Sequence, residues 1–151
     1  MRERGFAIVK AYSGQGISLP SRKTACSAGY DLSSAVDAIL QPGQLTVLPT
    51  GIKAYMQPGE VLLIFIRSSM ALRHQLALAN GVGVVDADYY DNPENEGHLQ
   101  LAVINRGDHP VVIKKGDRVA QGIFLPYLTV DKDAAGKGES REGGFGSTGK
   151  R

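Results

Sequence analysis

The stretch EVLLIFIRSSMALRHQLALAN, residues 60–80, joins two segments whose side chains follow different patterns. Residues 60–67 are rich in β-branched, leucine and aromatic side chains, which predicts a strand. Residues 68–80 carry the only good helix pattern of the sequence, and Ser68 or Ser69 can cap it. Four apolar side chains would give this helix its contacts: Met70, Leu72, Leu76 and Leu78. The stretch therefore predicts one helix attached to a β-rich domain.

Short β-rich segments also occur on both sides of this stretch, separated by turn residues. The further candidate strands are 5–12, 38–41, 44–56, 98–106, 109–115 and 118–130. The turn sequence QPG occurs at 41–43 and again at 57–59. Many short strands at this spacing favour an all-β sandwich, barrel or jelly roll.

Composition limits the class of protein further. The 151 residues suffice for one domain with a substantial core. The formal net charge of +2 lacks the basic excess of a dedicated nucleic-acid binder. No apolar run approaches the roughly 18 residues of a membrane span, and residues 1–13 lack the apolar segment of a secretory leader. We therefore expect neither a nucleic-acid partner nor a membrane partner.

The single cysteine, Cys26, bears on the compartment. It cannot form an internal disulfide, which fits a reducing compartment, and we expect a cytoplasmic protein. Small residues surround it, so a buried or inert thiol is a better interpretation than a nucleophile.

Apolar periodicity stops at Asp131. Residues 131–151 contain one aromatic, Phe145, so we expect a flexible arm (131–151) attached to a β domain (1–130). The last residues, GGFGSTGKR, contain most of a phosphate-loop pattern, but Arg151 stands where that loop needs Ser or Thr, and no helix follows. Two interpretations remain, a loose tail or a mobile arm that closes on a phosphate held elsewhere.

Four stretches inside the expected domain are more polar than their surroundings. They are AGYDLSS (28–34), RSSMA (67–71), ANGVGVVDADYY (79–90) and KGDRVAQGIF (115–124). Each has a purely structural interpretation: an aspartate turn, a helix cap, a polar hairpin end, and a hairpin with Asp117 and Arg118 as a surface pair. In a strand, Asp86 and Asp88 would share one face and Tyr89 would lie on the other, unless a turn intervenes.

Two common kinds of catalytic site find no support. The three histidines, His74, His98 and His109, do not fall in metal-ligand spacing with one another or with Cys26, so we expect no zinc site. The sequence has no Gly-x-Ser-x-Gly elbow, which argues against a serine hydrolase.

Taken together and in order, five stretches are more specific than any one of them. AGYDLSS, RSSMA, NGVGVVDADYY, GDRVAQ and RxGGFGSTG, the last beginning at Arg141, resemble the five motifs of the homotrimeric dUTP pyrophosphatases, or dUTPases. The resemblance runs from about residue 17 to the end with the spacing intact. It implies a distorted jelly-roll β-barrel with one short helix and a flexible C-terminal arm, and a homotrimer with active sites at the subunit interfaces.

The resemblance also implies a reaction, the hydrolysis of dUTP to dUMP and pyrophosphate with Mg²⁺. This reaction limits uracil in DNA and supplies dUMP for dTMP synthesis. Asp31 would reach the Mg²⁺ through water, which suits an ion that keeps its hydration shell. Arg67, Ser68 and Ser69 would hold phosphate oxygens. Asp86 would orient and activate the water that attacks the α-phosphorus, and Gln121 would help to place that water or the α-phosphate.

Base and sugar selection would come from the third motif. Asn80, with the nearby backbone of Gly83 and Val85, would match O4 and N3–H of uracil and reject the amino group of cytosine. Tyr89 would pack under the deoxyribose and leave no room for a 2′-hydroxyl. A plain core tyrosine is the alternative interpretation of Tyr89.

The last motif would supply the arm. Phe145 would stack on the uracil, Gly146, Ser147 and Thr148 would wrap the phosphates, and Arg141 would pair with the γ-phosphate. Glycines let a backbone approach a ligand closely.

The sequence departs from the family pattern in two places. Ser69 stands where the family usually has Gly, and Met70 where it usually has Leu. YDNPENEGH (90–98) is longer than the usual short turn, and we expect it to be a solvent loop.

Two other functions compete with the dUTPase interpretation. A dCTP deaminase would share the jelly-roll fold, but the GGFGSTG arm argues against it. A catalytically silent dUTP-binding regulatory protein would not need Asp86 and Gln121, which are both present.

Overall fold

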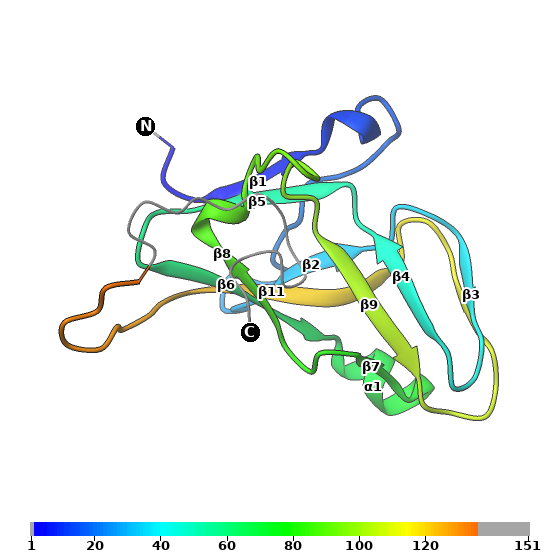
Figure 1. Cartoon of the computed structure of the whole chain (residues 1–151). Helices are drawn as coiled ribbons and strands as arrows, with labels where there is room; N and C mark the ends of the chain where they lie inside the picture. Colours follow the sequence, from blue (N-terminus) through cyan, green and yellow to red (C-terminus); the bar gives the residue numbers. More distant parts are fainter. Residues whose placement is uncertain (1, 136–151) are drawn as a thin grey trace.

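Residues 2–135 are described by a computed structural model, and within them the chain is built mainly of antiparallel strands (Figure 1). The strands are β1 (Gly5–Ile8), β2 (Tyr30–Ser33), β3 (Ala38–Leu40), β4 (Leu45–Pro49), β5 (Ile52–Tyr55), β6 (Glu60–Ile66), β7 (Leu76–Leu78), β8 (Gly83–Asp86), β9 (Gln100–Asn105), β10 (Val111–Ile113) and β11 (Arg118–Pro126). One α-helix, α1 (Ser68–His74), and two 3₁₀ turns, η1 (Lys10–Tyr12) and η2 (Ala87–Tyr89), lie between them. The predicted all-β class with one short helix is confirmed.

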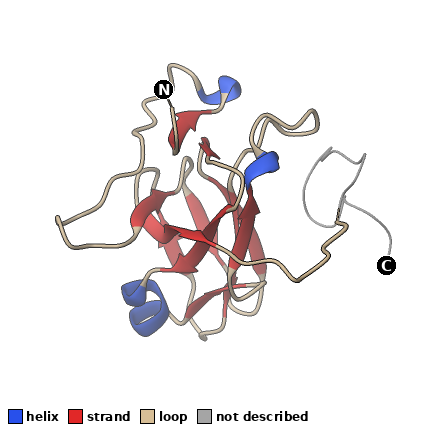
Figure 2. Ribbon diagram, turned by 90° about the vertical axis from the view of Figure 1, so that its left-hand side faces the viewer, coloured by secondary structure: helices blue, strands red, loops and turns tan. Residues whose placement is uncertain are grey.

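The strands form two larger sheets and two isolated pairs. The larger sheets have the orders β2-β11-β6-β8 and β4-β9-β7, and the pairs are β1-β5 and β10-β3. The sheets do not close into one continuous barrel, so the predicted distortion is also present. Figure 2 shows the strands gathered at the centre and the helical turns at the periphery. Among the described residues, no helix has the length and hydropathy that a membrane crossing requires.

The core consists of aliphatic side chains from both larger sheets and from the two isolated pairs. Seven of them have no exposed surface: Leu32, Leu40, Leu48, Leu62, Val103, Val119 and Ala120. Burying one such leucine or valine side chain contributes about 1.5–3 kcal/mol, so this cluster supplies much of the drive to fold.

The predicted helix 68–80 is wrong beyond His74. Gln75 adopts a left-handed backbone (φ 55°, ψ 36°) and ends α1, and β7 then pairs with β9. Leu76 and Leu78, two residues apart, are both buried as strand residues, whereas Leu72 is 82% exposed. The predicted serine caps are also absent, because Arg67 occupies the N-cap and no side chain caps the helix.

Other boundaries shift for local reasons. The candidate strand 44–56 is two strands, because the chain turns at Gly51 (φ 74°) and moves from pairing with β9 to pairing with β1. Candidate strand 5–12 ends at Ile8, and 118–130 ends at Pro126. The AGYDLSS stretch contains β2, which polar composition concealed.

Two expectations about exposure need correction. Cys26 is exposed, which excludes the buried thiol, and the inert thiol stays a prediction. Residues 90–98 are not a simple solvent loop, because Asn92 and His98 are both buried. Most of the proposed 131–151 arm lies outside the described residues, so the 1–130 and 131–151 division stays a prediction.

We predict that Asn105→Ala destabilises the fold strongly. Asn105 is fully buried, and its Nδ2 donates to the carbonyl oxygens of Leu40 (2.8 Å) and His109 (2.9 Å). Its Oδ1 accepts the N–H of Gly107 (2.9 Å). The substitution removes one buried and two part-buried hydrogen bonds, so the free energy of unfolding should fall by about 3 kcal/mol.

Urea denaturation measures this loss. Gln41→Ala, an exposed substitution in the nearby turn, is the control and should change stability by at most about 0.5 kcal/mol. Equal stabilities for the two variants would contradict the assigned role of Asn105.

Candidate functional site

The predicted site residues gather in two separate hollows. The first depends on β11, which pairs with β2 on one side and with β6 on the other. Gln121 lies opposite Asp31 in β2 and opposite Phe65 in β6. Arg67 follows the end of β6, so strand pairing brings the first, second and fourth polar stretches together.

This first hollow has a volume of about 330 Å³. Its lining residues are Lys23, Ser27, Gly29, Asp31, Arg67, Ser68, Ser69, Arg118 and Gln121. The structure therefore groups Asp31, Arg67, Ser68, Ser69 and Gln121 as the sequence predicted.

One carboxylate faces several cations in the first hollow. Asp31 Oδ2 lies 3.3 Å from Arg118 Nη1, and Asp31 Oδ1 lies 4.0 Å from Arg67 Nε. Arg67 Nη1 donates to the carbonyl oxygen of Arg118 (3.2 Å), which fixes the guanidinium. With Lys23 also present, the positive charge exceeds the negative charge, and the hollow suits an anion with several oxygens.

Gly29 creates the room that Gln121 occupies. A Cβ at position 29 would overlap Gln121 Oε1 and lie 3.1 Å from Gln121 Cβ. The glycine of AGYDLSS therefore allows the amide of Gln121 to lie across β2 within the hollow.

The second hollow, about 290 Å³ in volume, lies against β8. Its lining residues are Ile64, Asn80, Val82, Gly83, Val84, Val85, Asp86, Tyr89, His98, Leu99 and Gln100. Asp86 ends β8, and η2 then turns the chain so that Tyr89 lines the same hollow. The 3₁₀ turn η2 therefore brings Asp86 and Tyr89 to the same hollow, although they would lie on opposite faces of a continuous strand.

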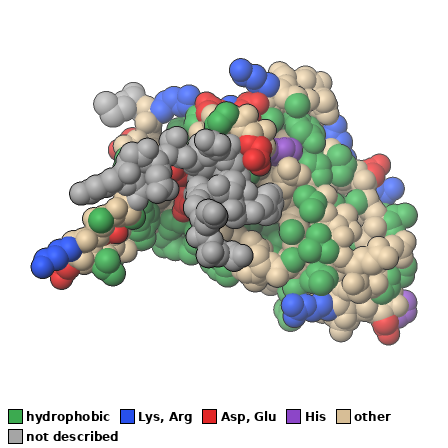
Figure 3. Space-filling model, viewed as in Figure 1, with side chains coloured by type: hydrophobic (Ala, Val, Ile, Leu, Met, Phe, Trp, Pro, Cys, Tyr) green, Lys and Arg blue, Asp and Glu red, His purple; other side chains and the backbone are tan. Residues whose placement is uncertain are grey.

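The second hollow combines apolar walls with a few polar groups, as small-molecule sites commonly do. The Val85 side chain is buried, so this residue offers mainly its backbone. Asn80 is exposed in the turn before β8. On the face drawn in Figure 3, hydrophobic side chains gather between Lys and Arg side chains that lie mostly at the edge.

His98 is a hydrogen-bond acceptor in this wall. Its Nε2 accepts the N–H of Gly51 (2.9 Å), and the Tyr12 ring centroid lies 5.1 Å from the imidazole. Burial lowers the pKa of His98, so the imidazole stays neutral at neutral pH.

Sequence reasoning missed several lining residues. Arg118 pairs with Asp31 and not with Asp117, whose carboxylate accepts the N–H of Lys114 (2.9 Å). Arg118 stands inside the GDRVAQ stretch, and its place opposite Ser33 in β2 could have identified it. Lys23 and Ser27 lie outside all the stretches singled out, and His98 ends the 90–98 stretch, which was expected to be a solvent loop.

The two hollows lie far apart on one chain. Asp86 pairs with Val61 near the start of β6, whereas Arg67 follows its end. Six residues of extended strand span about 20 Å. One chain therefore does not join the two groups of residues in one pocket.

Five predicted residues cannot be placed. Arg141, Phe145, Gly146, Ser147 and Thr148 lie outside the described residues, and their roles stay predictions.

The described part of the chain has no cluster of three or more His, Cys, Asp or Glu side chains able to hold a metal ion. Asp31 is the one carboxylate among the residues that line the first hollow. A single carboxylate fits an ion that keeps most of its waters and takes its other ligands from a bound anion, as Mg²⁺ does.

Comparisons with known proteins give one consistent result. The dUTPase family model matches residues 15–149. A deoxyuridine 5′-triphosphate nucleotidohydrolase of Lactococcus lactis is 50% identical over 149 residues, covering 99% of each chain. A relative of the same description from Desulfitobacterium hafniense is 44% identical over 140 residues, covering 87% of each chain.

Solved structures agree with this match. The crystal structure of dUTPase from Streptococcus mutans has a TM-score of 0.79 and 47% identity, covering 84% of this chain and 98% of that one. The dUTPase of phage phi11 of S. aureus, described with a structural Mg(II) ion, has a TM-score of 0.72, covering 87% of this chain and 95% of that one. Its identity of 20% supports the fold alone.

We predict that Arg67→Ala weakens the affinity of the first hollow for inorganic tripolyphosphate. A hydrogen bond to a charged group contributes about 1.5–3 kcal/mol, so the dissociation constant should rise about 10- to 100-fold. Isothermal calorimetry measures it. Arg106→Ala, an exposed arginine beyond β9, removes the same charge elsewhere and should leave the affinity nearly unchanged.

Proposed function

Because the chain belongs to the dUTPase family, we propose that it hydrolyses dUTP to dUMP and pyrophosphate. The observation that carries this proposal is the 50% identity, over 99% of both chains, with a deoxyuridine 5′-triphosphate nucleotidohydrolase. The enzyme limits the uracil available to DNA and supplies dUMP for dTMP synthesis.

The first hollow takes the triphosphate in this proposal. Arg67, with the hydroxyls of Ser68 and Ser69, binds phosphate oxygens, and the contact with the Arg118 carbonyl keeps the guanidinium in place. Gln121 points its amide toward the α-phosphate or the attacking water. Mg²⁺, when bound, neutralises phosphate charge, and Asp31 would hold its hydration shell.

The second hollow takes the nucleoside. Asn80 and the backbone of Gly83 and Val85 read the uracil edge, because an amide both donates and accepts. The Tyr89 ring excludes a 2′-hydroxyl. Asp86 bonds the 3′-hydroxyl and orients the attacking water, so that its proton passes to the carboxylate as the water attacks the α-phosphorus.

A complete site in this proposal needs more than one chain. Asp86 lies opposite Val61 and Gln121 opposite Phe65, so four residues of β6, about 13 Å, separate them, and one α-phosphorus cannot contact both within one chain. A second copy that brings its Asp86 hollow to the Asp31 hollow of the first removes this difficulty. We propose a homotrimer with three equivalent shared sites, over which residues 131–151 close through Arg141, Phe145, Gly146, Ser147 and Thr148.

The compartment is also part of the proposal. Cys26, the single cysteine, forms no disulfide within the chain, which suits the cytoplasm.

The first test is a substrate panel. We predict pyrophosphate release from dUTP at a kcat/KM more than tenfold above that for UTP, dTTP and dCTP, because Tyr89 and Asn80 select sugar and base. Ammonia release from dCTP, or nucleotide binding without turnover, would reject the proposed reaction.

A complementation experiment tests the shared site. Asp86→Asn should lower kcat by roughly 10²-fold or more, the usual effect of losing a general base, while nucleotide binding persists. Asp88→Asn removes the same charge two residues away, outside the hollow, and should retain most activity.

Mixing the Asp86→Asn and Arg67→Ala proteins, followed by subunit exchange, should restore activity. Some mixed oligomers then contain an intact Asp86 hollow facing an intact Arg67 hollow. A mixture no more active than its two components would show that each chain holds its own site.

A further inference from the structure

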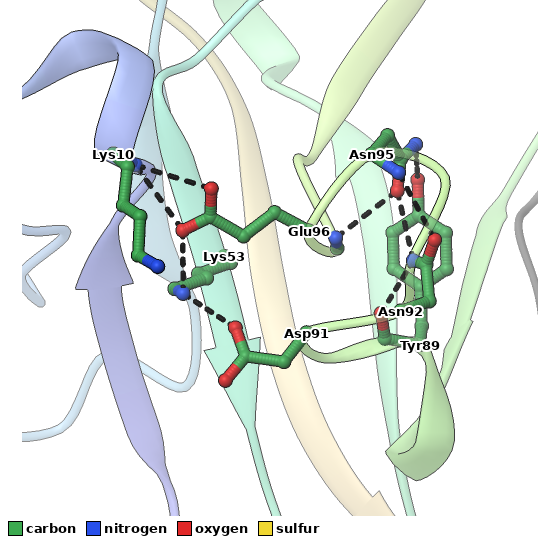
Figure 4. Close-up of polar contacts among 8 residues, drawn as sticks. Lys10, Lys53, Tyr89, Asp91, Asn92, Asn95 and Glu96 are labelled. Atoms are coloured by element: carbon green, nitrogen blue, oxygen red, sulfur yellow. Dashed lines mark hydrogen bonds and ion pairs between the residues drawn. The ribbon is translucent and has the colours of Figure 1, made fainter.

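The 90–98 loop, the departure from the family pattern that the proposed function leaves without a role, is directly bonded to Tyr89 (Figure 4). Asn95 Nδ2 donates to the Tyr89 hydroxyl oxygen (2.8 Å). The Tyr89 hydroxyl in turn donates to the carbonyl oxygen of His98 (3.0 Å). These two bonds fix the hydroxyl end of the Tyr89 side chain.

The loop also binds the backbone of Tyr89. Asn92 Nδ2 donates to the Tyr89 carbonyl oxygen (2.7 Å) and to Asn95 Oδ1 (2.8 Å). Asn92 Oδ1 accepts the N–H groups of Glu94 (3.0 Å) and Asn95 (3.1 Å). The two asparagines therefore form one network that joins the backbone and the hydroxyl of the same tyrosine.

Lys53, a buried residue of β5, ties this network to the domain. Its Nζ lies 2.5 Å from Asp91 Oδ1 and 2.7 Å from Glu96 Oε2. Figure 4 shows both carboxylates pointing to this ammonium group. Burial lowers the pKa of Lys53, but the bonds to Asp91 and Glu96 outweigh burial and leave it raised.

Loop backbone geometry depends on the same contacts. Asp91 and Glu96 have left-handed backbones (φ 57° and 67°), which cost side-chain-bearing residues about 1 kcal/mol or more each. The next residue, Gly97 (φ 86°), passes so close that a Cβ there would lie 2.7 Å from the Tyr89 carbonyl oxygen. The strain and the close approach show a loop shaped around Tyr89.

We infer that Asn95 is a specificity-determining residue that positions the Tyr89 ring, and that the 90–98 loop sets how strictly the site rejects a 2′-hydroxyl. The inference rests on the proposed function, because it assigns the loop to the sugar selection made by Tyr89. A ring that excludes one oxygen atom must be held within about 0.5 Å, which a side chain anchored at both ends satisfies.

The experiment compares Asn95→Ala with Glu94→Ala. Among the described residues, the Glu94 side chain makes no hydrogen bond or ion pair, so its removal controls for mutation of the same loop. In Asn95→Ala, the ratio of kcat/KM for dUTP to that for UTP should fall at least tenfold, with kcat for dUTP within threefold of wild type. An unchanged ratio overturns the inference.

Tyr89→Phe separates positioning from general support of the fold. It keeps the ring and removes the hydroxyl that Asn95 bonds, so it should lower the ratio by a similar factor without disturbing the loop backbone. In the Tyr89→Phe background, Asn95→Ala should lower the ratio no further, because Asn95 acts on the ring through its bond to the Tyr89 hydroxyl, and the other Asn95 bonds, to Asn92 and Gly97, lie within the loop. Independent, additive losses would overturn the inference. If Asn95→Ala does not fold, Tyr89→Phe alone decides: a lowered ratio supports the inference, and an unchanged ratio overturns it.

A binding measurement separates this inference from the proposed reaction. The ratio of the dissociation constants of UMP and dUMP reports sugar selection without turnover. A wild-type protein that selects dUMP but does not hydrolyse dUTP would reject the reaction, and the effect of Asn95→Ala on the binding ratio would still decide the inference.

Discussion

Pairing of β11 with both β2 and β6 is the constraint on which the first hollow depends. Asp31, Gln121 and Arg67 come from three distant parts of the sequence, and the antiparallel register places them together. A slip of one residue in either pairing would turn the Gln121 side chain to the opposite face of the sheet. Leu32 and Val119, both fully buried next to these polar residues, hold the register by their packing.

Sequence patterns predicted the strands best where burial alternates or is continuous, as in β6 and β9. They failed where two patterns overlap. Leu76 and Leu78 were assigned to a helix that begins at Ser68. The left-handed Gln75 instead ends the helix, and the two leucines become the buried, alternate residues of a strand. The strand β2 was not predicted, because polar residues such as Asp31, which lines the first hollow, gave the segment no strand-like composition.

The resemblance of five stretches to one family named the candidate residues of the described domain, and the structure groups them in two hollows. It could not show that these hollows lie at opposite ends of β6, because that separation follows from the pairing of Asp86 with Val61. Nor could it identify Arg118 as the partner of Asp31, since a neighbour in sequence, Asp117, offered a simpler pair. Long-range register, which short motifs do not encode, decides both points.

The buried position of Lys53 has a consequence for changing this protein by design. Its ammonium is compensated by Asp91 and Glu96, both supplied by the 90–98 loop. Replacing the loop by a short turn would remove both carboxylates from the Lys53 ammonium and, because the same loop contacts Lys53, would also change its exposure to water. Loop length and the residue in β5 are therefore coupled, and a design that shortens the turn must choose the side chain at position 53 together with it.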